Sequence, residues 1–157
     1  MKKHFLGIDP GQTGAVCRVC SPEIEIFDWA GVVDTAYLVK SWVEKHNICG
    51  AYIEDVQPMP DDRNHIVSLG KLIRNAGHWE GILTASGIAV KRISPRQWRK
   101  SFCYRYNNKK EIKKISLYHA RNLFSQYEKK YFAREKDHNR AEAALIAYQC
   151  ERFFEDE

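Results

Sequence analysis

The sequence contains few of the residues that mark non-globular proteins. Only 9 of its 157 residues are glycine and 5 are proline, which excludes collagen-like repeats and low-complexity linkers. No apolar stretch approaches the roughly 18 residues that a membrane-spanning helix needs, and the apolar run before Asp9 is too short for the core of a signal peptide. Hydrophobic residues make up 44% of the chain. We therefore expect one soluble, intracellular domain covering residues 1–157.

The cysteines do not predict a disulfide framework. There are five, an odd number, and no secretory signal precedes them, so structural disulfides are not expected. Cys17 and Cys20 have the C-x-x-C spacing of a redox or zinc site. However, residues 14–20 predict a strand, in which side chains three apart face opposite sides of the sheet. Reduced thiols are therefore favoured over a metal or redox pair.

Positive charge is concentrated in one third of the chain. The formal net charge is +5, but residues 91–135 hold 14 Lys and Arg against 3 Glu, a net charge of +11. The remaining residues have a net charge of −6. One basic region attached to an acidic remainder predicts a polyanionic partner on one face. A solvated helix surface explains the charge alone equally well.

The hydrophobic pattern predicts an α/β fold built on five strands. Strands are expected at residues 4–9, 14–20, 24–29, 51–56 and 88–93, and helices at 34–46, 64–86, from Pro95 onward, 109–126 and 138–153. Short links between the first three strands favour an antiparallel meander, whereas a strand that follows a helix favours parallel pairing. Asp34 is the predicted N-cap of the first helix. Its predicted apolar stripe is Tyr37, Leu38, Trp42 and Val43.

Carboxylates stand at the ends of two predicted strands. Asp9 closes the first strand and Glu54 closes the fourth. If these strands are parallel neighbours, the two carboxylates emerge side by side, where they repel unless a cation lies between them. The last helix adds Glu142 within an apolar stripe, where a purely structural carboxylate is costly. Asp137 lies at or near the start of that helix, with His138 beside it.

Taken singly, these acids have plain structural explanations as a turn, an edge residue or a helix cap. Together they form the set of hard oxygen ligands that two Mg²⁺ ions need when they lie about 3.5–4 Å apart. Such a pair of ions activates water on one side of a phosphodiester and stabilises the leaving oxygen on the other. The set therefore predicts metal-dependent phosphodiester hydrolysis.

Three segments, in chain order, resemble the acidic motifs of RuvC-type Holliday junction resolvases, most closely the short bacteriophage-like members. They are residues 7–15 (GIDPGQTGA), 52–54 (YIE) and 137–147 (DHNRAEAALIA). The resemblance runs through nearly the whole chain. It implies a ribonuclease H-like fold, a homodimer, two Mg²⁺ or Mn²⁺ ions per active site and paired symmetric nicks across a four-way DNA junction. It also implies the cytoplasm of a bacterial or phage-infected cell.

The resemblance assigns site residues by position. The matches to three catalytic metal ligands of the family are Asp9, Glu54 and Glu142. The fourth ligand of the family usually lies three or four residues before the final acid, where this chain has Asn139 and His138. Asp137, five residues before it, is the predicted catalytic ligand, because the helix start can bend to present it. His138 is its competitor.

The basic third supplies the predicted DNA contacts. Lys110 is the predicted lysine near the scissile phosphate, and Arg99 is a second phosphate contact. The full predicted set is Arg96, Arg99, Lys100, Lys109, Lys110, Lys113 and Lys114. Trp98 is predicted either as a stacking surface for bases or as a core residue. Met59 stands in the region where several family members carry an aromatic wedge.

Proteins with other functions also combine this predicted fold with acidic ligands and a basic surface. A ribonuclease acting on RNA–DNA hybrids uses the same fold and metal chemistry, as would a nuclease acting on other branched DNA. A non-catalytic nucleic-acid-binding module would have the fold without the hydrolysis. Residues 9–14 also resemble the first phosphate loop of sugar-kinase and actin-like ATPases. Those proteins close two such domains around a nucleotide, and 157 residues are too few for that.

Overall fold

The computed structural model describes residues 2–56 and 66–154. The strands are β1 (Lys3–Asp9), β2 (Ala15–Cys20), β3 (Glu23–Asp28), β4 (Asn47–Glu54) and β5 (Val90–Ile93). The helices are α1 (Val32–Lys45), α2 (Ile66–Ala85), α3 (Pro95–Lys100), α4 (Lys109–Leu123), α5 (Glu128–Tyr131) and α6 (His138–Phe153), with short 3₁₀ turns η2 (Ser125–Tyr127) and η3 (Glu135–Asp137). None of the helices in these two ranges is both long enough and apolar enough to cross a membrane.

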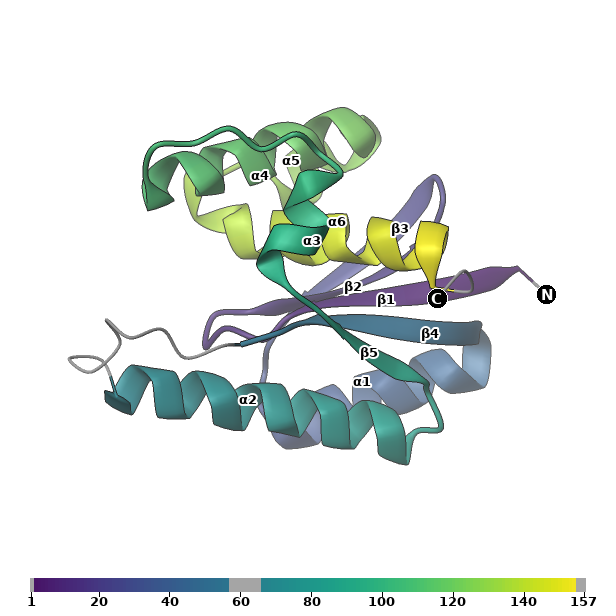
Figure 1. Cartoon of the computed structure of the whole chain (residues 1–157). Helices are drawn as coiled ribbons and strands as arrows, with labels where there is room; N and C mark the ends of the chain where they lie inside the picture. The colour runs from purple at the N-terminus through teal and green to yellow at the C-terminus, as the bar shows by residue number, and fades with distance from the viewer. Residues whose placement is uncertain (1, 57–65, 155–157) are drawn as a thin grey trace.

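The strands form one mixed sheet in the order β3-β2-β1-β4-β5 (Figure 1). β1, β2 and β3 pair as an antiparallel meander, while β4 pairs in parallel with β1 on one side and β5 on the other. The predicted five-stranded sheet, with a meander followed by parallel strands, is confirmed. The parallel pairing of β1 and β4 brings their carboxyl ends to the same edge of the sheet.

Helices cover both faces of the sheet, and alternating strand residues supply the two cores. Figure 1 shows α1 and α2 on one face and α3, α4 and α6 on the other. Leu6 and Ile8 of β1 pack in the core under α1 and α2, together with Trp79. Phe5 of β1 and Tyr52 of β4 pack in the core under α6. This alternation decides which face each strand-end side chain occupies.

Helix α1 differs from the prediction in its start and in its buried face. It begins at Val32 after Gly31, which has a φ of 91° and no side chain to cap the helix, so Asp34 lies inside the first turn. The buried side chains are Thr35, Val39 and Trp42, spaced as one face of a helix. Of the predicted stripe, Tyr37 is 70% exposed. Trp42 and Leu38 of the predicted stripe do contact the core, whereas Tyr37 and Val43 are exposed, because large apolar residues on neighbouring faces obscure the true period.

Other boundaries shift by a few residues. β4 begins at Asn47 rather than residue 51, β5 begins at Val90 rather than residue 88, and α4 ends at Leu123. The final helix is confirmed over His138–Phe153. Met59 lies outside the described residues. All five cysteines are unpaired, which agrees with the predicted reduced thiols.

Candidate active site

Asp9 and Glu54 lie side by side because their strands pair in parallel. The register places Ile8 opposite Ile53, and each carboxylate is the next residue along its strand. Since side chains alternate along a strand, Glu54 shares the face of Tyr52, which packs in the core under α6. The same alternation turns Asp9 away from Ile8, onto this face. Both acids therefore face the layer that contains α6.

Glu142 lies above the same strand ends because α6 packs directly against the backbone of β1. A Cβ atom at Gly7 would overlap the backbone nitrogen of Ala147 and the carbonyl oxygen of Ala143. The close approach therefore requires glycine. It holds the first turns of α6 over the carboxyl end of β1, so the third acid joins the other two.

The three carboxylates repel one another in a buried setting. Burial raises the pKa of Asp9 to about 7, and the charge of Glu54 adds to the rise. Burial, followed by the charges of Asp9 and Glu54, raises the pKa of Glu142 to about 8. Burial also raises the pKa of Glu54. A cation placed among these side chains would relieve both the burial cost and the repulsion.

Each carboxylate receives a hydrogen bond that fixes its orientation. The donors are the Gly11 backbone N–H to Asp9 Oδ1 (3.0 Å), Trp98 Nε1 to Glu54 Oε2 (2.7 Å) and Ser116 Oγ to Glu142 Oε1 (3.2 Å). The hydroxyl of Tyr104 lies 2.7 Å from Ser116 Oγ and extends this chain of hydrogen bonds toward the core. The Trp98 side chain is fully buried, so the core interpretation of this residue is confirmed.

The loop that follows Asp9 is fixed by a buried amide. Asn75 of α2 donates through Nδ2 to the carbonyl oxygens of Pro10 (2.9 Å) and Gly11 (3.0 Å). Within the loop, the N–H of Gly14 donates to the carbonyl oxygen of Gly11 at 2.9 Å, and a Cβ at Gly14 would overlap the Asp9 carbonyl oxygen. These contacts hold the backbone around Asp9 in one conformation.

Arg99 of α3 lies among the acids. Its Nη2 atom is 3.8 Å from Glu54 Oε2 and 3.9 Å from Glu142 Oε1, and its charge opposes the rise in pKa of all three carboxyl groups. The guanidinium also lies over the Trp98 ring, 5.0 Å from its centroid. Arg99 therefore acts as an internal counter-ion of the carboxylates, a role that its prediction as a phosphate contact did not include.

The three acids suit Mg²⁺ in their chemistry, because carboxylate oxygens are the hard ligands that this ion prefers. Their spacing is less suited. Among residues 2–56 and 66–154, no three His, Cys, Asp or Glu side chains are arranged to hold a metal ion. Arg99 bridges Glu54 and Glu142 in the conformation described. The donor set fits the ion in its chemistry, and a guanidinium lies between two of its three members.

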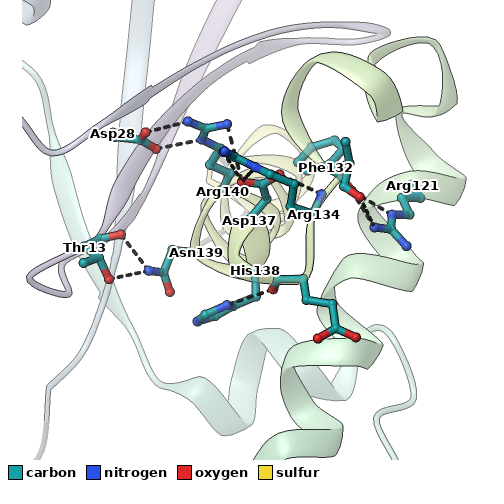
Figure 2. Close-up of polar contacts among 11 residues, drawn as sticks. Thr13, Asp28, Arg121, Phe132, Arg134, Asp137, His138, Asn139 and Arg140 are labelled. Atoms are coloured by element: carbon teal, nitrogen blue, oxygen red, sulfur yellow. Dashed lines mark hydrogen bonds and ion pairs between the residues drawn. The ribbon is translucent and has the colours of Figure 1, made fainter.

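Asp137 belongs to a different network (Figure 2). Arg134 Nη2 donates to Asp137 Oδ1 at 2.8 Å, and Arg140 Nη1 lies 3.6 Å from the same oxygen. Arg140 in turn forms a bidentate pair with Asp28, at 2.6 and 2.8 Å. Burial alone would raise the pKa of Asp137, but the hydrogen bonds and charges of the two arginines outweigh it and lower the pKa. The structure does not bring Asp137 to the other three acids, because two arginines hold it.

His138 and Asn139, the next two residues of α6, point away from this cluster and make separate contacts (Figure 2). His138 Nδ1 lies 3.3 Å from the carbonyl oxygen of Glu135, and His138 and Asp137 both line a separate hollow of about 440 Å³. Asn139, three residues before Glu142, donates through Nδ2 to the carbonyl oxygen and hydroxyl of Thr13, at 2.6 and 2.7 Å. Asn139 thereby ties α6 to the β1–β2 loop.

Basic residues flank the acids. A hollow of about 890 Å³ is lined by Asp9 and Glu54, and by three predicted DNA contacts of the α3 segment, Arg96, Arg99 and Lys100. The other predicted contacts lie on α4, where Lys110, Lys113 and Lys114 are exposed. The side chain of Lys109 lies outside what the structure describes. Lys113 is close enough to His138 to lower its pKa, after the larger effect of burial.

Sequence reasoning missed three side chains that support the acids. They are Asn75, Ser116 and Tyr104. Asn75 had a usable signal, because a polar residue interrupts the apolar spacing of Leu72, Ala76 and Trp79 on α2. Ser116 and Tyr104 had none, since a serine in an amphipathic helix and a tyrosine in a loop are ordinary surface residues.

The strand order, the strand directions and the helix across β1 define a ribonuclease H-like fold. Two solved structures share it: RuvC of Thermus thermophilus in complex with a Holliday junction substrate, with a TM-score of 0.60, and RuvC of Thermus thermophilus, with a TM-score of 0.57. Each alignment covers 98% of this chain and 96% of the other, at 15% sequence identity. No protein-family model and no curated protein matches the sequence. The likeness establishes the fold.

Proposed function

We propose that the chain is a Mg²⁺-dependent endodeoxyribonuclease that resolves four-way DNA junctions, acting as one cytoplasmic domain over residues 1–157. The observation that carries the proposal is the group of three carboxylates with raised pKa values, one buried and two largely buried, beside a hollow that is also lined by Arg96, Arg99 and Lys100. The choice of a four-way junction is supported by the shared fold with a protein solved on a Holliday junction substrate. Mn²⁺ is expected to substitute for Mg²⁺.

Asp9, Glu54 and Glu142 are the residues that would hold two metal ions. Asp137 and its competitor His138, the candidates for a fourth ligand, line a separate hollow, so either would have to leave its present contacts to join them. When bound, the ions would supply a water of lowered pKa and charge stabilisation for the leaving oxygen. The pKa values of all three carboxyl groups are raised. This favours the binding of a divalent cation, because the cation relieves the repulsion between the ionised carboxylates.

The chain's own residues position the DNA and the acids. Arg96, Arg99 and Lys100 line the hollow beside Asp9 and Glu54, where they would bind phosphate oxygens through charge-assisted hydrogen bonds. Lys110, exposed on the first turn of α4, would contact the scissile phosphate. In-line attack by water would break the P–O3′ bond, which leaves a 5′ phosphate and a 3′ hydroxyl.

Paired nicks across a two-fold symmetric junction require two active sites, and we propose a homodimer. The face formed by α1 and α2 suits a second copy of the chain. An apolar hollow of about 780 Å³ lies between these helices, and open space lies above Gly77 and Gly81. Exposed apolar side chains on the same helices are Val33, Tyr37, Ile66, Val67 and Ile73. Sedimentation of the purified protein tests this, and a monomer at micromolar concentration would contradict it.

The proposal is tested first by removing one carboxylate charge. Asp9→Asn should reduce the nicking of a four-way junction in Mg²⁺ by at least about 100-fold, because one of the charged carboxylates that would hold the ions is lost. Binding of the junction should be retained. Asp34→Asn is the matched control, since Asp34 is exposed on α1. Unchanged nicking by Asp9→Asn would favour a non-catalytic binding module. Preferential cleavage of an RNA–DNA hybrid would favour the ribonuclease alternative.

A further inference from the structure

Of the cations within residues 2–56 and 66–154, Arg99 is the one that acts on all three acids. Among the described residues, the only positive charge that lowers the pKa of Asp9, Glu54 and Glu142 is that of Arg99. A single nitrogen, Nη2, lies within 3.9 Å of both glutamates. The side chain is 19% exposed. Arg99 thus occupies the space between two carboxylates that the proposed function assigns to metal ions.

Arg99 fits this space poorly. Its distances of 3.8 and 3.9 Å are too long for hydrogen bonds. Its Nε atom is buried and has no hydrogen-bond partner among the residues that the structure describes. Arg140 of the same chain shows what a well-fitted pair looks like, because it contacts Asp28 through two hydrogen bonds of 2.6 and 2.8 Å. A buried N–H without an acceptor is costly. The guanidinium therefore neutralises the carboxylates without being firmly held by them.

We propose that Arg99 is a positioning residue that occupies the divalent-ion site until an ion replaces it, and that it thereby sets the ion affinity of the site. The inference rests on the proposed function. Arg99 also lines the 890 Å³ hollow with Arg96 and Lys100. If the ion displaces the Arg99 side chain, this hollow has the space to take it up. Binding of the ion would then move the Arg99 guanidinium into the hollow beside Arg96 and Lys100, where DNA phosphates are expected to bind.

The test is Mn²⁺ binding to the full chain without DNA, measured by calorimetry and by the electron paramagnetic resonance of free Mn²⁺ at pH 8.5. Arg99→Gln should bind Mn²⁺ at least about 10-fold more tightly than wild type, because a like charge beside the ion has been removed. Arg99→Lys keeps the charge and should stay within about three-fold of wild type. Arg96→Gln is the matched control, since it removes one charge from the same helix outside the acid cluster.

A second measurement is made on the wild-type chain. The Arg99 guanidinium lies 5.0 Å from the centre of the Trp98 ring, so its displacement should change tryptophan emission when wild type is titrated with Mg²⁺. The change should be absent in Arg99→Gln and in Trp98→Phe. A Mg²⁺ titration that leaves the wild-type emission unchanged while calorimetry shows binding would overturn the proposal.

The outcomes separate the two proposals. Equal or weaker Mn²⁺ binding by Arg99→Gln overturns the role of Arg99 and leaves the nuclease proposal standing. Tighter binding by Arg99→Gln, with no cleavage of any DNA by wild type, supports the role of Arg99 and removes the nuclease proposal. Absence of Mn²⁺ binding by every variant at millimolar ion overturns both.

Discussion

Trp98 donates a hydrogen bond from its indole Nε1 to Oε2 of Glu54, at 2.7 Å. The side chain is fully buried, and it connects α3 to the carboxyl end of β4. One residue therefore fills the core and orients an acid of the candidate site. A hydrogen bond from a neutral donor to a charged acceptor contributes about 1.5–3 kcal/mol, so this contact is strong enough to matter for both stability and catalysis.

Trp98→Phe removes this donor while keeping an aromatic ring in the core. We expect junction cleavage to fall by about 10- to 100-fold, because the Glu54 carboxylate loses its fixed orientation. Trp42→Phe is the matched control, since Trp42 donates the same kind of bond to Glu25 at 2.9 Å, and Glu25 is outside the candidate site. Cleavage rates and melting temperatures of both variants are compared. Equal rates for the two variants would contradict the positioning role of Trp98.

Replacing glycine by alanine should have opposite effects at Gly7, where β1 contacts α6, and at Gly70, on the surface of α2. Gly7→Ala should prevent folding or lower stability by more than about 3 kcal/mol, because the new methyl group overlaps the backbone of Ala147 and overpacking a tight contact is strongly destabilising. Gly70→Ala, on the exposed surface of α2 with nothing within 4 Å, should raise stability by up to about 1 kcal/mol. Urea denaturation of both proteins checks this. A Gly7→Ala protein of wild-type stability would refute the close packing.

Without metal, the protein should lose stability as the pH rises from about 5 to 8. The pKa of Asp9 rises from 3.8 to about 7 and that of Glu142 from 4.5 to about 8. The folded state therefore keeps protons that the unfolded chain has released. The stabilisation is complete below about pH 4 and is lost as the pH rises through the folded-state values, at about 1.4 kcal/mol per pKa unit for each group.

Denaturant unfolding in a metal chelator at pH 5.5, 7 and 8.5 measures this loss. Glu142→Gln should flatten the dependence, because one titrating group is gone, and Mg²⁺ should flatten it in wild type by binding the ionised carboxylates. A wild-type stability that increases across the same range would contradict the raised pKa values.

The Mn²⁺ affinities of two variants, Asp137→Asn and His138→Ala, test which residue is the fourth ligand. Because Arg134 and Arg140 already pair with Asp137, Asp137→Asn should lower stability by about 1–3 kcal/mol and change Mn²⁺ affinity by less than about three-fold. A loss of more than about ten-fold in affinity would instead make Asp137 the fourth ligand. His138→Ala, measured in the same way, tests the competing assignment, and calorimetry of both variants decides between them.

The sequence predicted the sheet and the strand-end acids because both follow from local patterns. Alternation and turn residues placed β1 and β4, and the parallel rule then brought Asp9 beside Glu54. The position of Asp137 depends on contacts between residues far apart in the sequence. Its partner Arg140 is held by Asp28 on β3, more than a hundred residues away, and no spacing rule reports such a pair.

Arg99 illustrates the same limit in the site. Its place in a basic segment predicted contact with phosphate, whereas the structure places it between two acids. That position depends on how α3 leaves β5 and packs through Trp98, which is a matter of tertiary geometry rather than of sequence pattern. The predicted buried face of α1 is partly wrong for a related reason, because exposed apolar residues such as Tyr37 are indistinguishable from buried ones in the sequence.

The most direct test of the account is a cleavage panel with wild type and Glu54→Gln in Mg²⁺. The substrates are a four-way junction, a three-way junction, a flap, a linear duplex and an RNA–DNA hybrid of matched sequence, each at equal concentration. We predict that wild type makes paired, symmetric nicks in the four-way junction in preference to the others, and that Glu54→Gln and a chelator each abolish them. Nicking that survives both treatments, or a hybrid cleaved faster than the junction, would contradict the account.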